Sequence, residues 1–193
     1  DDALDEVRTI LGASPNEVCT LAQEQNILCV RGEHDHAIVT GETTNFDRLS
    51  KAALAWTMET MTRESRELLS SFPLHIGKRV AGLNLLVFHG TPADKLGGYV
   101  YADAPEATFA AAFAATSAAI IIAGHTHLPF QRAIGKKLWV NPGSVGQPRD
   151  QDPRASYAVL DISTSGVTVR FKKVPYDIES AVQRIAAAGL PSD

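Results

Sequence analysis

The stretch AAIIIAGHTH, residues 118–127, joins an unbroken apolar run directly to a glycine and two histidines. A short apolar run without polar alternation is typical of a strand that is buried on both faces. Such strands occur in sheets that helices cover on both sides. The stretch therefore predicts an α/β protein with a buried strand over Ala118 to Ala123.

Two further apolar runs precede histidines in the same way. Leu83 to Phe88 leads into His89, and Ile27 to Val30 is followed closely by His34. Because ligands bind outside the carboxyl ends of strands in open α/β sheets, we expect these segments to converge on one site. Four of the six histidines in the chain would then share it: His34, His89, His125 and His127.

Helix and strand signals fill the rest of the chain. Helices are predicted over residues 2–8, over 14–25, in two pieces from 45 to 71 with Thr62 as a cap, over 103–115 with a capping box at Asp103, and after Asp177. Strands are predicted over 137–140, 157–162 and 167–174, so the C-terminal part is richer in antiparallel sheet.

Composition excludes several classes of protein. The 193 residues carry 45% hydrophobic and 21% charged residues and a net charge of -4, which is typical of a soluble globular domain. Scattered basic residues and short apolar runs predict neither a nucleic-acid nor a membrane partner. The two cysteines, Cys19 and Cys29, fit a reducing compartment, so we expect a cytoplasmic protein.

The spacing of the histidines favours a metal site. On an extended segment, His125 and His127 would point to the same face and could bind one metal or two adjacent metals. Asp35 follows His34, and a carboxylate beside a histidine can fix its tautomer and raise its basicity. A polar turn is an equally good interpretation of that pair.

Four motifs together carry a resemblance to a known family. GEHD at 32–35, HGTP at 89–92, GHTH at 124–127 and NPGSVGQPRD at 141–150 resemble the ordered motifs of the calcineurin-like metallophosphoesterases, in their small bacterial and archaeal branch. The similarity spans residues 14 to 162. It implies two mixed β-sheets packed as a sandwich and flanked by helices, with a two-metal centre at one edge.

The resemblance also implies roles for individual residues. His89 and His125 would bind one divalent ion and His127 the other, with Glu33 standing where the family has a metal-binding asparagine. His34 would protonate the leaving group, and Asp35 would orient it. Two ions of Mn, Fe, Zn or a mixture would activate water for attack on a phosphorylated substrate, either a phosphomonoester or a phosphodiester.

Two family motifs are absent from the sequence. The resemblance leads us to expect one domain over residues 1–193 that lacks its N-terminal strand, with Asp-x-His, and a segment near residues 9–13, where Gly-Asp belongs. Residues 11–13 could instead be the remnant of Leu-Gly-Asp with its ligand lost. The sequence predicts nothing about the substrate or the oligomeric state.

Other interpretations remain open at this point. A scaffold or binding module of the same fold would explain the missing ligands, and a zinc hydrolase with one metal would need three histidines to reach one ion. Arg149 and Arg154 are candidates to meet a phosphate. Tyr99 and Tyr101 line a substrate cleft or simply pack, and residues 141–144 are expected to form a tight turn.

Overall fold

The computed structural model describes residues 12–190 of the chain and divides them into two units, each treated by itself. The helical unit comprises residues 12–29, 33–72 and 175–190. The sheet unit comprises residues 30–32 and 73–174. The predicted helix over residues 2–8 and most of the segment near residues 9–13 lie outside the described residues.

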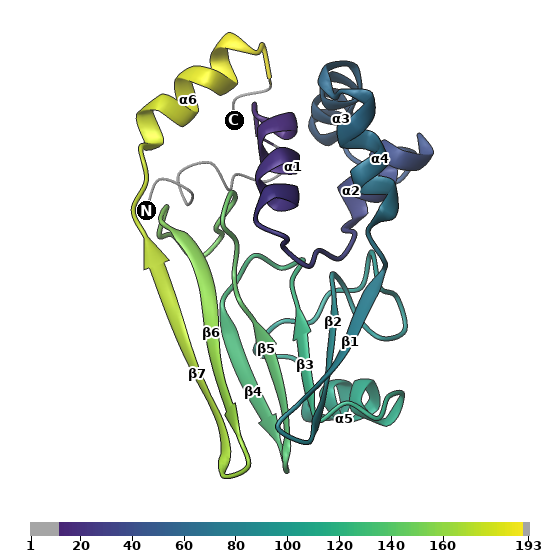
Figure 1. Cartoon of the computed structure of the whole chain (residues 1–193), viewed down its shortest axis with the longest axis vertical. Coiled ribbons are helices and arrows are strands. Elements are labelled where there is room, and N and C mark those ends of the chain that lie inside the picture. Colours follow the sequence, from purple (N-terminus) through teal and green to yellow (C-terminus); the bar gives the residue numbers. More distant parts are fainter. Residues whose placement is uncertain (1–11, 191–193) are drawn as a thin grey trace. The chain divides into compact units, whose positions relative to one another are not determined.

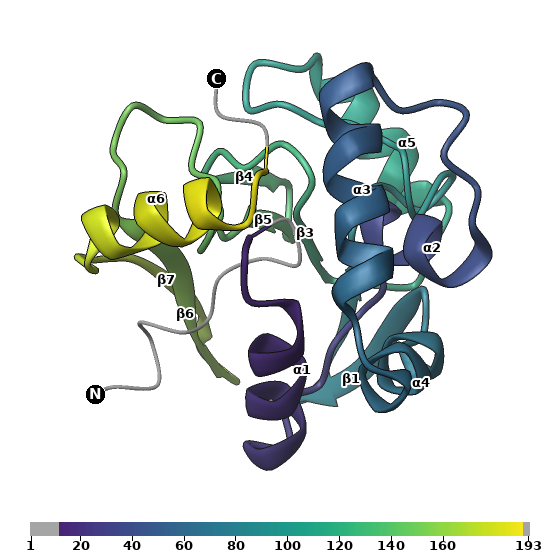
Figure 2. The same cartoon turned by 90° about the horizontal axis from the view of Figure 1, so that it is seen from above.

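The helical unit is built around a small apolar core. Its helices are α1 (Pro15–Glu24), α2 (Glu33–Thr40), α3 (Arg48–Thr60), α4 (Arg63–Ser71) and α6 (Ile178–Ala187). Helix α2 packs against α3 and α4, and α4 also packs against α1 (Figure 2). The buried apolar side chains between them come from Cys19, Ala37, Ile38, Leu54, Met61 and Leu69.

Capping side chains set several helix starts. Thr62 accepts a hydrogen bond from the Ser65 backbone N–H, and Asp177 accepts one from that of Ser180, so both predicted caps are confirmed. The predicted capping box at Asp103 is wrong: helix α5 (Glu106–Ala114) has Pro105 at its N-cap and no side-chain cap. Proline lies next to the helix start there, and its fixed φ suits that position.

The sheet unit contains a five-stranded mixed sheet. Its strands are β1 (His75–Val80), β2 (Leu83–Phe88), β3 (Ile120–Ala123), β4 (Phe130–Ile134) and β5 (Lys137–Asn141), in the order β1-β2-β3-β5-β4. The three central strands run parallel, and each edge strand is antiparallel to its neighbour (Figure 1). A second sheet is the antiparallel hairpin of β6 (Ala155–Ser163) and β7 (Gly166–Val174).

Helix α5 covers one face of the five-stranded sheet through aromatic packing. Trp139 on β5 is 1% exposed and lies edge-on to Phe109 and Phe113, with ring centroids 5.7 and 6.4 Å away. Phe88 at the end of β2 completes the cluster, 6.1 Å from Trp139. Burial of these rings stabilises the sheet unit, and the cluster includes the last residue of β2.

The predicted fold class is confirmed: the chain is a mixed α/β protein with a five-stranded mixed sheet, a second smaller sheet and helices. The strand predicted over residues 27–30 is wrong. Ile27 and Leu28 are 49% and 67% exposed, and the nearby Arg31 N–H donates to the Pro73 carbonyl without forming a ladder. A short apolar run becomes a strand only where neighbouring strands pair with it.

Candidate metal centre

The carboxyl ends of β2 and β3 bring two of the predicted histidines together. Phe88 and Ala123 are register partners at the ends of these strands, and pairing continues one residue further, where the Gly124 N–H donates to the His89 carbonyl. The side chains that follow, His89 and His125, therefore leave the sheet at the same edge. The predicted convergence is confirmed for these two strands.

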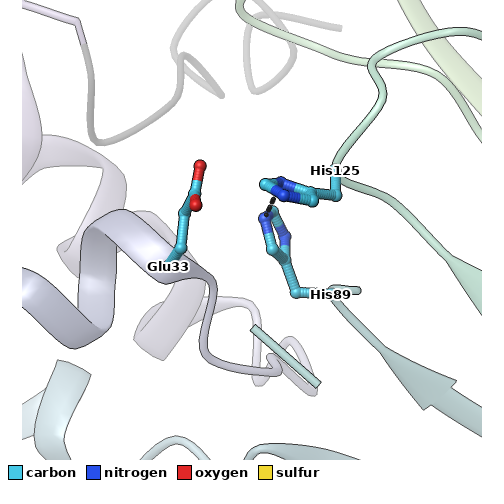
Figure 3. Close-up of side chains that lie close together, drawn as sticks. All are labelled: Glu33, His89 and His125. Atoms are coloured by element: carbon cyan, nitrogen blue, oxygen red, sulfur yellow. Dashed lines mark hydrogen bonds between the residues drawn. The ribbon is translucent and has the colours of Figure 1, made fainter. Parts of the chain in front are cut away.

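The two imidazole rings are in direct contact. His89 Nε2 and His125 Nδ1 lie 2.8 Å apart and share a hydrogen bond, and Figure 3 shows the rings turned toward each other. His125 is 4% exposed. Burial lowers the pKa of His125 to about 4, because the charged ring would lose its hydration. Its ring is therefore neutral at physiological pH, the state that binds a metal.

The backbone around His125 turns sharply. His125 has a φ of 65°, and the Thr126 N–H donates to the Gly124 carbonyl across it at 2.8 Å, which closes a γ-turn. His127 also has a positive φ, 60°. The expectation of an extended segment is wrong, since β3 ends at Ala123 and the chain bends to leave the sheet. Non-glycine residues with such values of φ cluster at functional sites.

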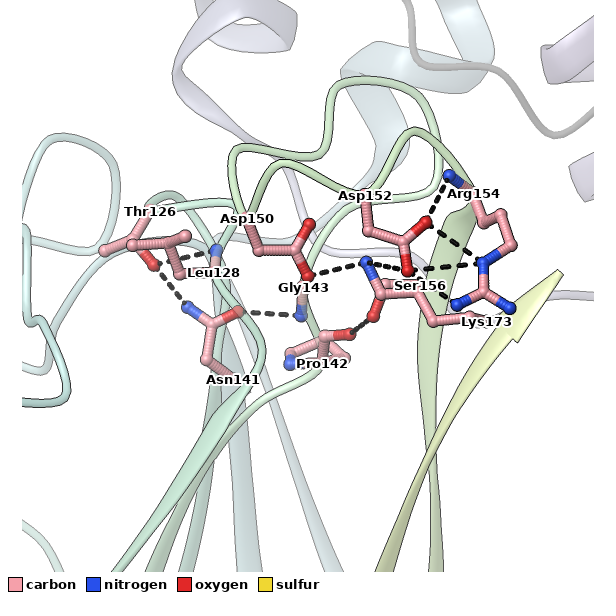
Figure 4. Close-up of polar contacts among 10 residues, drawn as sticks. All are labelled: Thr126, Leu128, Asn141, Pro142, Gly143, Asp150, Asp152, Arg154, Ser156 and Lys173. Atoms are coloured by element: carbon pink, nitrogen blue, oxygen red, sulfur yellow. Dashed lines mark hydrogen bonds and ion pairs between the residues drawn. The ribbon is translucent and has the colours of Figure 1, made fainter. Parts of the chain in front are cut away.

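Asn141 holds this turn from the end of β5. Its Nδ2 donates to the Gly124 carbonyl at 2.7 Å and to Thr126 Oγ1 at 2.9 Å, and its Oδ1 accepts from the Gly143 N–H at 2.9 Å. Figure 4 shows the contacts of Asn141 with Thr126 and with Gly143. Asn141 and Thr126 are each 1% exposed. The expected tight turn at residues 141–144 is wrong, because β5 ends at Asn141, β6 begins only at Ala155, and no backbone turn is assigned to residues 142–144. The Asn141 side chain instead holds residues 124–127, here called the histidine loop.

His127 lies beside this pair. A protonated His127 ring would repel a protonated His125 ring, and this repulsion contributes to lowering the pKa of His125. Burial lowers the pKa of His127 itself. Among the residues that the structure describes, its buried Nδ1 has no hydrogen-bond partner. A buried ring nitrogen without a partner is rare in proteins and is a position that a metal ion would satisfy.

The segment after β5 separates the two candidate arginines. Arg149 lies close enough to lower the pKa of both His125 and His127 through its charge. Arg154 instead forms a bidentate pair with Asp152, with contacts of 2.7 to 3.2 Å (Figure 4). Its charge is thereby neutralised, so Arg149 remains the better candidate to meet a phosphate.

Glu33, His34 and Asp35 lie in the first turn of α2, in the helical unit. The Glu33 carboxylate is 3.5 Å from His34 Nδ1, and the His34 ring packs edge-on against Phe46 at 4.7 Å. Sequence reasoning did not predict this helix, although its two acidic residues are favoured in a first turn. The roles of all three residues in metal binding and catalysis remain predictions.

The residues of the sheet unit fit a divalent metal. His89 and His125 present neighbouring nitrogens, His127 adds a buried nitrogen, and imidazole is a preferred ligand of Zn and Fe ions. The hydrogen bonds of Asn141 support the loop that carries two of these rings, as outer residues do in metal sites. Fold and site together define an α/β protein with a candidate metal-binding group at the strand ends.

The chain belongs to the calcineurin-like phosphoesterase superfamily, whose domain matches residues 5–165. An uncharacterized protein of Methanocaldococcus jannaschii is 30% identical over 197 residues, which cover 93% of this chain and 78% of that protein. The family supports metal binding and a phosphoesterase activity in general.

Two solved structures are similar over nearly the whole chain. A metallophosphoesterase from Sphaerobacter thermophilus is 27% identical with a TM-score of 0.75, covering 94% of this chain and 80% of that one. A hypothetical protein from Pyrococcus horikoshii is 22% identical with a TM-score of 0.84, covering 94% and 77%. Both confirm the fold. Among residues 12–190, no helix is long and apolar enough to cross a bilayer.

Proposed function

We propose that the protein is a metal-dependent hydrolase of phosphate esters that uses two divalent ions. The observation that carries the proposal is the buried contact between His89 and His125 at the ends of two parallel strands. Membership of the phosphoesterase superfamily supports the reaction class. Phosphomonoesters and phosphodiesters are both candidate substrates, Mn, Fe and Zn are candidate ions, and a cytoplasmic location is part of the same proposal.

Different residues of the chain would bind the ions, bind the phosphate and donate the proton. As the family resemblance implies, His89 and His125 would hold one ion, with Glu33 in the position of the family's metal-binding asparagine, and His127 would contribute to holding the other. When bound, two such ions activate water and neutralise charge on the phosphoryl oxygens. Arg149 would attract the phosphate, and His34 would donate the proton that the leaving oxygen needs.

The test is metal content measured together with turnover. The purified protein, incubated with Mn or Zn, should hold about two ions per chain by elemental mass spectrometry. It should hydrolyse p-nitrophenyl phosphate or bis-p-nitrophenyl phosphate, and a chelator should abolish this. His125→Ala should lose metal and activity together.

The matched control is His75→Ala, which removes an exposed histidine on β1. It should retain both metal and turnover. One ion per chain would favour the hydrolase with a single metal. No ion after incubation would contradict the proposal and favour a binding module of the same fold.

A further inference from the structure

Two exposed tyrosines lie next to the histidine pair. Tyr99 and Tyr101, here called the tyrosine pair, are 49% and 43% exposed. Their rings are nearly parallel, with an interplanar angle of 6° and centroids 6.0 Å apart. Two nearly parallel rings with this exposure present a flat aromatic surface to solvent.

The tyrosine pair is continuous with the candidate metal centre. The Tyr99 ring stacks on the His125 ring, with centroids 3.7 Å apart and an angle of 28°. His125 in turn contacts His89 at 2.8 Å. A group bound on the tyrosine pair would therefore lie beside the position where a phosphate would be held.

The loop that presents the tyrosines is tightly closed. The Gly90 N–H donates to the Lys95 carbonyl and the Thr91 N–H to the Asp94 carbonyl, at 2.8 and 2.7 Å. A Cβ at Gly98 would lie 2.5 Å from Thr91 Oγ1, so only glycine permits this approach. These contacts restrain the loop up to Gly98, the residue before Tyr99, and a restrained loop loses less freedom when a ligand binds.

We propose that the tyrosine pair is a stacking platform for a planar aromatic group on the substrate, so that the preferred substrates are aryl or nucleobase-containing phosphate esters. This inference rests on the proposed function and narrows its substrate class. Stacking of a ring on an aromatic side chain tolerates many ring types. Stacking does not tighten the binding of phosphate esters of glycerol or of a sugar without a base. The proposal therefore predicts a measurable difference in affinity between the two kinds of ester.

The test compares binding of ligands that differ only in the aromatic group. Calorimetric titration of the metal-loaded protein should show adenosine 5′-monophosphate binding about tenfold more tightly than ribose 5-phosphate. Tyr101→Ala should remove this difference, and Tyr101→Phe should retain it because the ring remains. Tyr157→Ala is the matched control, since Tyr157 is 37% exposed on β6 and should have no effect.

Phenyl phosphate distinguishes the two sources of an aromatic ring. If it binds as tightly as adenosine 5′-monophosphate, the platform takes any aryl ester; weaker binding indicates a nucleobase. The proposal would be overturned if adenosine 5′-monophosphate and ribose 5-phosphate bind equally tightly, or if neither binds. It would also be overturned if the ratio of their two affinities is unchanged in Tyr101→Ala. Tyrosine-dependent binding without turnover of any ester would contradict the proposed function alone.

Discussion

Replacing Asn141 with alanine should destabilise the protein and loosen its histidine loop. The change removes three hydrogen bonds, two donated to the Gly124 carbonyl and Thr126 Oγ1 and one accepted from the Gly143 N–H. At about 1 kcal/mol each, with partners left in a buried site, the unfolding free energy should fall by about 3 kcal/mol. For a chain of this length that lowers Tm by about 6–12 °C.

The same variant should bind metal less tightly, by about 10- to 100-fold, because Asn141 supports the loop that carries His125 and His127. Calorimetric unfolding and titration with Zn or Mn measure the two effects. Asn84→Ala is the control, since exposed Asn84 makes one long hydrogen bond, to the Ser117 carbonyl at 3.3 Å. If the Tm of Asn141→Ala lies within about 2 °C of that of the unsubstituted protein and its metal affinity is unchanged, Asn141 does not hold the histidine loop in place.

Three further substitutions test other parts of the molecule. Gly143→Ala should lower the unfolding free energy by about 1–3 kcal/mol in a thermal unfolding assay, because its φ is +86° and the new Cβ would lie 2.6 Å from Ser156 Oγ. Gly135→Ala is the control. Its φ is +58° with open space around the new Cβ, so it should lower the unfolding free energy by less. Lys173→Ala removes the 2.6 Å ion pair with Asp150, which holds the pKa of that carboxyl below its usual range. The variant should therefore have a lower Tm than the unsubstituted protein near pH 7. The difference in Tm should shrink as the pH falls below about 4, because the Asp150 carboxylate then becomes protonated. Glu33→Asn should preserve or raise hydrolysis and should change the metal content if Glu33 is a ligand. An unchanged metal content together with an unchanged rate would count against that role.

Local sequence patterns were sufficient for much of the fold. The apolar runs ending at Phe88 and Ala123 predicted buried strands, and strand direction then placed His89 and His125 at one edge. The same rule failed at residues 27–30, because an apolar run does not reveal whether neighbouring strands will pair with it. Edge strands β1 and β4 were not predicted as strands, since their exposed, partly polar residues give a weaker signal.

The geometry of the site depends on contacts that sequence spacing does not encode. The positive φ of His125 and its γ-turn are held by Asn141, which lies 17 residues from Gly124 along the chain. Tyr99 stacks on the His125 ring, and backbone hydrogen bonds close the loop of residues 90–98 that precedes Tyr99. Residue identities could therefore name candidate ligands, whereas the orientation of those ligands required the folded structure.

The hydrogen bonds of Asn141 stabilise the strained backbone of the histidine loop. Two non-glycine residues with φ of 65° and 60° each cost of order 1 kcal/mol or more, so the loop would relax if nothing held it. The hydrogen bonds to the Gly124 carbonyl and to Thr126 offset that cost and hold the segment that carries both rings. A site needed only for packing would gain nothing from such strain. Its persistence beside a buried nitrogen of His127 that lacks a partner among the described residues favours metal binding over a purely structural role.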